Sequence, residues 1–387
     1  MKTLRSGRNR RKWIYVLLLM GLLGLSGCGS PSSASVEMSS QTELVKTGSM
    51  ELQYAENFAV DYYEDGYKML TTLPDSKRYL IVPEGQPVPR GLDEDVSILQ
   101  EPLQNIYLVA SGVMDMFASV DAVDQIRFSG QKQENWYIQT AKDAMAAGDM
   151  IYAGKYSKPD YELLVSEGCD LAIENRMITH SPEVVEMLQS FDIPVMIEYS
   201  SYEQHPLGKV EWVKFFGALT GKEAEAEEAF AEQTEILEKV ESGEKTGKTI
   251  AFFYVTSNGL IQVRQSTDYI PKLIELAGGR YIFEDLEDSG SGRSTLNMQV
   301  EDFYAGAKDA DILIYNSSID GGVTTLDELI GKCNILKDFK ALQEGQVYCT
   351  TNDMYQQSMA IGYLLQDMHT VLTDDDTAKL RYLFLLQ

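Results

Sequence analysis

The sequence predicts an α/β protein of two lobes, each built on a parallel central sheet, with a long helical connector between them. Three observations support this prediction. Short apolar runs alternate with helical patterns in the first half of the chain, the same alternation restarts in the second half, and the longest helical stretch lies between the two series. Strands that alternate with helices favour parallel sheets covered by helices on both faces. We therefore expect two Rossmann-like lobes with a cleft between them.

The expected strands are short apolar runs, most of them flanked by turn or capping residues. They are Tyr79–Val82, Ile106–Val109, Ile126–Phe128, Leu171–Ile173, Val195–Ile197, Ile250–Val255, Ile312–Tyr315 and Val347–Cys349. Two helix boundaries are also marked. Ser181-Pro182 begins one helix, with proline at its first position, and Gly278-Gly279 ends another that starts near Asp268.

The pattern of residues 206–243 predicts the helical connector. Apolar side chains recur every three positions from Leu207 to Leu219, and a second apolar stripe runs from Ala226 to Val240. Thr220 and Glu223 fit a capping box between the two segments. The chain is thus divided into an N-terminal lobe over 50–205, the connector over 206–243 and a C-terminal lobe over 244–387.

The N-terminus has the pattern of a bacterial lipoprotein signal peptide over residues 1–27. Six basic residues precede the apolar run from Trp13 to Leu25, and Leu25-Ser26-Gly27-Cys28 follows as the processing site. This run of thirteen residues is shorter than the roughly 20 that a membrane-spanning helix needs. We expect a lipid on Cys28, a flexible tether over 28–49, and a location at the outer face of the cytoplasmic membrane or in the periplasm.

Charge and cysteine content limit the function classes. Residues 1–27 hold six of the 33 basic residues and no acidic ones, so the rest has 27 basic against 59 acidic residues, a net charge of −32. Such a surface repels nucleic acid.

In an oxidising compartment the three remaining cysteines allow at most one internal pair, for which Cys333 and Cys349 are the candidates, and Cys169 is expected to be a buried free thiol.

Catalytic motifs are missing from the sequence. It contains no HExxH, P-loop, GxSxG or GxGxxG pattern, and its histidines are only His180, His205 and His369. We therefore expect a protein that is not an enzyme and holds no permanent cofactor.

From about Gln100 onward, the order and spacing of several segments resemble the substrate-binding lipoproteins of ABC importers, in the class whose lobes are joined by one long helix. The segments are Asn105–Gly130, Pro159–Leu164, Gly168–Ile173, Phe191–Val195, Tyr269–Gly279, Gln299–Phe303, Ala310–Ile314 and Leu342–Tyr348. The class handles ferric siderophores, haem and cobalamin. The resemblance implies a monomer that delivers its ligand to an ABC permease and ATPase complex, with Glu162 and Glu301 docking against permease arginines.

Ligand residues are expected in the loops after the strands, because open parallel sheets bind ligands at the carboxyl ends of their strands. The candidates are Ser111, Trp136, Asn175, Arg176, Tyr199, Tyr202, Tyr254, Arg264, Asn316, Asn352 and Tyr355. Arginine is scarce beyond residue 27, yet Arg176 and Arg264 fall in one candidate region of each lobe. Their planar guanidinium groups suit an anionic ligand, and the aromatic residues suit a macrocycle or an aromatic chelator.

The favoured ligand is a ferric siderophore, with cobalamin second and haem third. Two functions of other classes stay open. A surface-anchored enzyme would need an acid/base pair facing the cleft, and a sensor or adhesin would not need Glu162 and Glu301 at matching positions of the two lobes.

Overall fold

The computed structural model describes residues 44–286, 294–317, 322–374 and 379–387. These residues belong to one compact unit, and none of their helices is long and apolar enough to cross a membrane. The signal peptide, Cys28 and residues 28–43 of the predicted tether lie outside the described residues.

The first parallel sheet has the strand order β12-β11-β6-β7-β8, and every neighbouring pair in it is parallel. Its strands and the helices between them are β6 (Ile106–Leu108), α1 (Val113–Ser119), β7 (Ile126–Ser129), α2 (Gln139–Ala147), β8 (Ile151–Tyr152), α3 (Tyr161–Ser166), β11 (Leu171–Asn175), α4 (Pro182–Ser190) and β12 (Val195–Glu198). A two-stranded ribbon of β9 (Gly154–Lys155) and β10 (Lys158–Pro159) is attached. The predicted helix start is confirmed, since Ser181 precedes α4 and Pro182 is its first residue.

The second sheet has the order β16-β14-β13-β17-β18-β19, and β15 also pairs with β13. Its elements are β13 (Thr249–Val255), β14 (Ile261–Arg264), α7 (Tyr269–Leu276), β15 (Arg280–Tyr281), β16 (Thr295–Met298), α8 (Val300–Ala307), β17 (Ile312–Tyr315), α9 (Leu326–Lys332), α10 (Lys340–Gln343), β18 (Val347–Thr350), α11 (Ile361–Thr373) and β19 (Leu383–Leu385). The central strands β13, β17 and β18 are parallel, as predicted. The outer strands β14, β16 and β19 pair antiparallel.

The segment before residue 101, which the sequence analysis gave only one strand, forms a sheet of its own. Its strands are β1 (Lys46–Ser49), β2 (Phe58–Tyr63), β3 (Lys68–Thr72), β4 (Lys77–Val82) and β5 (Val96–Gln100), and they lie in that order. Short turns join β2 to β3 and β3 to β4, which makes these pairs antiparallel. The predicted strand Tyr79–Val82 therefore exists within β4 but belongs to this sheet rather than to the parallel one.

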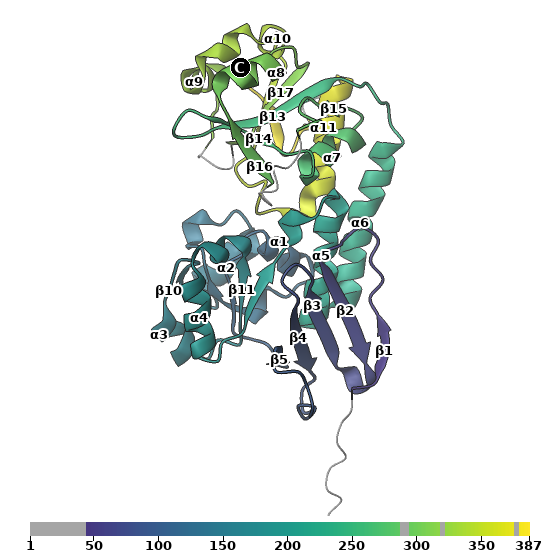
Figure 1. The fold of residues 1–387 in the computed structure, drawn as a ribbon, viewed down its shortest axis with the longest axis vertical. Helices are drawn as coiled ribbons and strands as arrows, with labels where there is room; N and C mark the ends of the chain where they lie inside the picture. The colour runs from purple at the N-terminus through teal and green to yellow at the C-terminus, as the bar shows by residue number, and fades with distance from the viewer. Residues whose placement is uncertain (1–43, 287–293, 318–321, 375–378) are drawn as a thin grey trace, which may run out of the picture. The chain divides into compact units, whose positions relative to one another are not determined.

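The predicted connector is present as two helices, α5 (Pro206–Thr220) and α6 (Glu223–Glu241), which fold back on each other (Figure 1). Gly221, with φ of 72°, ends α5 in the left-handed conformation that favours glycine. The predicted capping box is wrong, because Thr220 closes α5 and its hydroxyl donates to the Phe216 carbonyl at 2.8 Å. Every residue of α5 from Pro206 to Leu219 is buried.

Helix α5 also packs against the sheet of β1–β5. Phe58 of β2 packs edge-on against Trp212 and Phe215, with ring centroids 4.9 and 5.3 Å apart. Two buried carboxylates, Glu203 and Glu211, accept the backbone N–H groups of residues 53–57. The segment that leads into β2 is therefore fixed against the connector by hydrogen bonds as well as by apolar contact.

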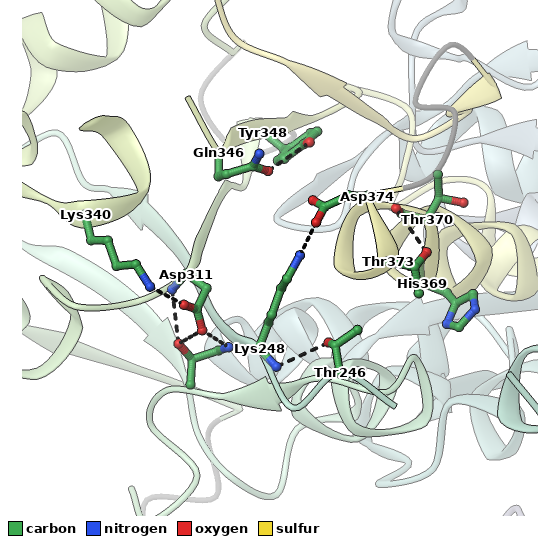
Figure 2. A network of polar contacts seen from close by, with 11 residues as sticks. Thr246, Lys248, Asp311, Lys340, Gln346, Tyr348, His369, Thr370, Thr373 and Asp374 are labelled. Atoms are coloured by element: carbon green, nitrogen blue, oxygen red, sulfur yellow. Dashed lines mark hydrogen bonds and ion pairs between the residues drawn. The ribbon is translucent and has the colours of Figure 1, made fainter. Parts of the chain in front are cut away.

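A polar network ties together the amino ends of the central strands of the second sheet (Figure 2). The Asp311 carboxylate, just before β17, accepts the backbone N–H and the hydroxyl of Thr249 at 2.7 and 2.9 Å, and it pairs with Lys340 of α10. Lys248 pairs with Asp374 at the end of α11. With these ends held, the carboxyl ends of the same strands point to the opposite edge of the sheet. Cys169, Cys333 and Cys349 form no disulfide with one another.

Candidate functional site

A cavity of about 750 Å³ lies where the two lobes meet. Most of its lining comes from the loops that follow β6, β11 and β12, at the carboxyl ends of the first parallel sheet. The connector adds Lys209 and the second lobe adds Tyr355 and Ser358; the other lining residues are Ala110, Ser111, Gly112, Asn175, Arg176, Met177, Thr179, His180, Glu198, Ser200, Ser201 and Tyr202.

Five of the predicted ligand residues line this cavity: Ser111, Asn175, Arg176, Tyr202 and Tyr355. Asn175 ends β11, and its side chain caps the following turn by accepting the Met177 N–H at 2.9 Å. The guanidinium carbon of Arg176 lies 4.5 Å from the centre of the Tyr202 ring. The loop after β11 thus presents a cation and an aromatic ring together.

Two predicted aromatic residues of the first lobe lie outside the lining. Trp136 is 1% exposed, and its indole N–H donates to the Ser129 hydroxyl at 3.0 Å. Tyr199 is also buried, with its ring 6.5 Å from that of Tyr202. Both follow a strand, as the sequence analysis required, but their large apolar rings are placed in the core instead of in the cavity.

In the second lobe, Tyr254 and Asn352 lie apart from the cavity. Tyr254 lines a separate hollow of about 340 Å³ with Lys332. Asn352 accepts a hydrogen bond from the Ser317 hydroxyl at 3.2 Å.

Arg264 and Asn316 do not line the cavity either, but they hold a residue that does. The Tyr355 hydroxyl accepts one hydrogen bond from Arg264 Nη2 and another from Asn316 Nδ2, the latter at 2.6 Å. Arg264 is further paired with Asp268 at 3.3 Å. Since a tyrosine hydroxyl has two acceptor sites and one proton, both acceptor sites are filled and the proton is left to donate.

Burial raises the pKa of Tyr355, while the Arg264 charge and the Asn316 hydrogen bond oppose that rise. Tyr355, a residue of the cavity lining, thus has its hydroxyl oriented by two donors.

Several residues of the lining were not predicted from the sequence. Those with side chains suited to polar recognition are Lys209, Glu198, His180 and Ser358. Glu198 ends β12, and its Oε2 accepts the backbone N–H and the hydroxyl of Ser200 at 2.9 and 2.6 Å. Lys209 lies in α5, whose other residues up to Leu219 are buried. A helix that is apolar on nearly all sides is a buried helix, so a lysine inside it was the available signal.

Direct hydrogen bonds join the lobes beside the cavity. Gln356 of the second lobe accepts the Tyr137 N–H and donates to the Asn135 carbonyl, both at 2.8 Å. The Asp115 carboxylate of α1 accepts the Met359 N–H at 2.8 Å. Gly112 permits this approach, because a Cβ there would lie 2.9 Å from the Ser358 hydroxyl oxygen.

Glu162 and Glu301 are exposed in the first turns of α3 and α8, and each of these helices precedes a strand. Their expected contact with a permease stays a prediction. Within the described part of the chain, no group of three or more His, Cys, Asp or Glu side chains is arranged to hold a metal ion.

Solved structures that share this architecture include bacterial transport and solute-binding proteins. A protein of an ABC-type Fe3+-hydroxamate transport system from Saccharomonospora viridis superposes with a TM-score of 0.55 and 16% identity, over 70% of this chain and 93% of its own. A periplasmic haem-binding protein from Vibrio cholerae gives 0.55 and 14%, over 69% and 98%. A periplasmic solute-binding protein from Veillonella parvula gives 0.54 and 13%, over 81% and 86%.

This chain has the fold of the periplasmic solute-binding proteins. The predicted fold class is thereby confirmed, and so is the resemblance to this group of proteins at the level of the fold.

Comparison by sequence gives distant relatives. Two uncharacterised lipoproteins from Methanocaldococcus jannaschii are similar to this chain over nearly its whole length. One is 24% identical, with 93% of this chain and 92% of the relative covered, and the other is 23% identical, with 89% and 90% covered. No protein-family model matches the chain.

Proposed function

We propose that this protein captures a metal chelate outside the cytoplasm and delivers it to an ABC permease and its ATPase, with a ferric siderophore as the favoured ligand. Its role is binding without chemical conversion. The observation that carries the proposal is the cavity of about 750 Å³ between the two lobes, lined from both lobes and from the connector.

The size and lining of the cavity support a small-molecule ligand. Binding sites for such ligands are clefts of about 300–1,000 Å³ with a few placed polar groups. Arg176, Lys209, His180 and the Tyr355 hydroxyl supply donors to the oxygen atoms of a chelate. Similar folds include the protein of an ABC-type Fe3+-hydroxamate transport system and the periplasmic haem-binding protein.

The proposal places the protein at the outer face of the membrane. Cys28 would carry the lipid, and the names of the Methanocaldococcus relatives agree with a lipoprotein. Glu162 and Glu301 would meet permease arginines as charge-assisted pairs, which set the orientation of docking.

Haem is a second candidate, and the Tyr355 hydroxyl favours it. Tyrosine is one of the axial ligands that proteins use for haem iron. The donors Arg264 and Asn316 would stabilise negative charge on the phenolic oxygen.

Tryptophan fluorescence of the full chain in detergent tests the proposal. Trp136 and Trp212 are the reporters, and the ligands are a panel of ferric siderophores, cobalamin and haemin. We expect saturable quenching by at least one ferric siderophore and weaker responses to the iron-free forms. Saturation by haemin alone, lost in Tyr355→Phe, would select the second candidate. No response to any compound would overturn chelate capture.

Uptake of a radiolabelled chelate that the protein binds tests the docking residues. The variant Glu162→Lys with Glu301→Lys is expected to bind the chelate normally and to lose most of its uptake, because both charges are reversed. Glu183→Lys is the matched control, since Glu183 is also an exposed acidic residue in a first helical turn. Normal uptake by the double variant would remove Glu162 and Glu301 from the proposed interface.

A further inference from the structure

Lys209 is a buried lysine whose charged end reaches the cavity. It lies in the first turns of α5, its residue is 5% exposed, and it contributes to the lining. Its Nζ lies 4.6 Å from the centre of the Tyr269 ring, a cation–π contact. No hydrogen bond to Nζ is found among the described residues, and no carboxylate oxygen of theirs lies within 4.0 Å of it.

The carboxylates around Lys209 are engaged elsewhere. Glu198 Oε2 accepts two hydrogen bonds from Ser200. Asp268 pairs with Arg264 through Oδ2 and accepts the Ile270 N–H through Oδ1. Both nearby carboxylates thus form their hydrogen bonds with other groups, and they act on the ammonium group of Lys209 only through their charge. Lys209 itself lines the cavity.

A second lysine of the same helix provides the contrast. Lys214 is buried to a similar degree, but its Nζ lies 2.9 Å from Glu227 Oε2 and 3.5 Å from Glu211 Oε1. A buried charge without a partner costs several kcal/mol of stability. Lys214 is thus a buried lysine with carboxylate partners, as is usual. Lys209 has no such ion pair, and it lies at the end of α5 that borders the cavity.

Burial lowers the pKa of Lys209, while Glu198 opposes the shift. An anionic group in the cavity would favour the charged form and supply the missing partner.

We propose that Lys209 binds an anionic oxygen of the ligand, so that the captured chelate carries carboxylate, catecholate or phosphate groups. This inference rests on the proposed function and specifies its ligand class. The anion site differs from the one expected from sequence, since Arg264 is committed to Asp268 and Tyr355. With Arg176 from the first lobe and the Tyr355 hydroxyl from the second, an anion at Lys209 has donors from all three parts of the molecule.

Fluorescence titrations of the full chain in detergent test the proposal with complexes of opposite character. The anionic probes are the ferric tris-catecholate complex and ferric citrate, and the neutral probe is ferric acetohydroxamate. We expect Lys209→Met to weaken binding of the anionic probes by tenfold or more, on the order of the loss when one partner of a buried charge pair is removed. Binding of the neutral probe should change less than about twofold. Lys214→Met is the matched control and should leave all the affinities unchanged.

Thermal unfolding separates a binding role from a structural one. Since no carboxylate of the described residues lies within 4.0 Å of Lys209 Nζ, Lys209→Met should raise the midpoint of unfolding, whereas loss of a structural lysine would lower it. Lys209→Arg keeps the charge and should keep the preference for anions. Should Lys209→Met not fold, the ¹⁵N resonance of Lys209 Nζ in the wild type, assigned with Lys209→Arg, still has to move when ferric citrate is added.

Each outcome decides the proposal. Equal affinity of wild type and Lys209→Met for the anionic probes overturns the role of Lys209 but leaves chelate capture intact. If no ferric complex binds the wild type, chelate capture is overturned. Titrations with citrate, catechol and inorganic phosphate without iron then test the anion site separately. Binding of one of them that Lys209→Met abolishes supports the site and identifies the anion. Binding of none overturns the site as well.

Discussion

Glu211 is a buried carboxylate that joins two distant parts of the chain. Its oxygens accept the N–H groups of Gln53, Tyr54 and Ala55 at distances between 2.8 and 3.2 Å. Hydrogen bonds to a charged acceptor contribute more than neutral ones. We expect Glu211→Gln to lower the free energy of unfolding by about 2 kcal/mol, measured by urea denaturation. The exposed Glu235→Gln on α6 is the control and should change it by less than about 0.5 kcal/mol.

Glu174 is also a buried carboxyl, but unlike Glu211 it has no hydrogen-bond partner for either oxygen among the described residues. Burial raises its pKa to about 8 from the ordinary 4.5. The folded state then holds the proton more tightly than the unfolded state, so this contribution to stability is full below pH 4.5 and is lost as the pH rises through 8.

Glu174→Met therefore should raise the free energy of unfolding at pH 7 by about 1–3 kcal/mol, since it removes two unsatisfied polar atoms. The gain over wild type should grow between pH 7 and pH 9. Urea denaturation across this pH range measures the difference. A gain that stays constant with pH would contradict a raised pKa for Glu174.

At the scale of elements, the close approach of α5 and α6 depends on Gly217. A Cβ at this position would lie 2.5 Å from the Ala226 Cβ and 2.9 Å from the Lys222 carbonyl oxygen. We expect Gly217→Ala to destabilise the protein by about 1–3 kcal/mol through overpacking. Gly331→Ala in α9 is the matched control, because no atom lies within 4 Å of its added Cβ. Alanine should stabilise that helix by up to about 1 kcal/mol, and calorimetric melting of both variants compares the signs.

The same elements show what the sequence could predict. Strands such as β13 and β17 are continuous apolar runs, since both faces of a parallel sheet are covered, and such runs are visible in the sequence. Strand β1 is exposed at all four residues, and β2, β3 and β5 are only partly buried, so β4 alone contains a continuous buried apolar run. The order of these strands could therefore not be predicted from the sequence.

The candidate site, too, could be predicted only in part. The loops after β6, β11 and β12 were predicted because topology alone places them at one edge of the sheet. Lys209 was missed because it lies within a helix, where a lysine is ordinarily a solvated residue. Arg264 was expected to bind ligand, but its pairing with Asp268 depends on three-dimensional contacts that no spacing reveals.

For the whole molecule, the contacts between the lobes lie beside the cavity and bear on how a proposed ligand would enter. Gln356, Met359 and Ser358 of the second lobe meet the first lobe at Tyr137, Asp115 and Gly112. The described state has these contacts formed while the cavity is bordered by both lobes. If the protein captures a chelate as proposed, breaking some of these contacts would widen the way into the cavity. Lobes joined by packed helices have only a small hinge motion available for this.

Gln356→Ala tests this coupling. The substitution removes both hydrogen bonds to the loop of residues 135–137, and we expect amide hydrogen exchange at Tyr137 to accelerate by about tenfold or more. The Trp136 amide, which bonds within its own loop to the Gln133 carbonyl, is the internal control and should not change. Because fewer contacts then oppose opening, the association rate of a bound chelate should rise, measured by stopped-flow fluorescence. Unchanged exchange at Tyr137 would mean that the lobes separate freely at this contact in the wild type, and that ligand entry is limited elsewhere.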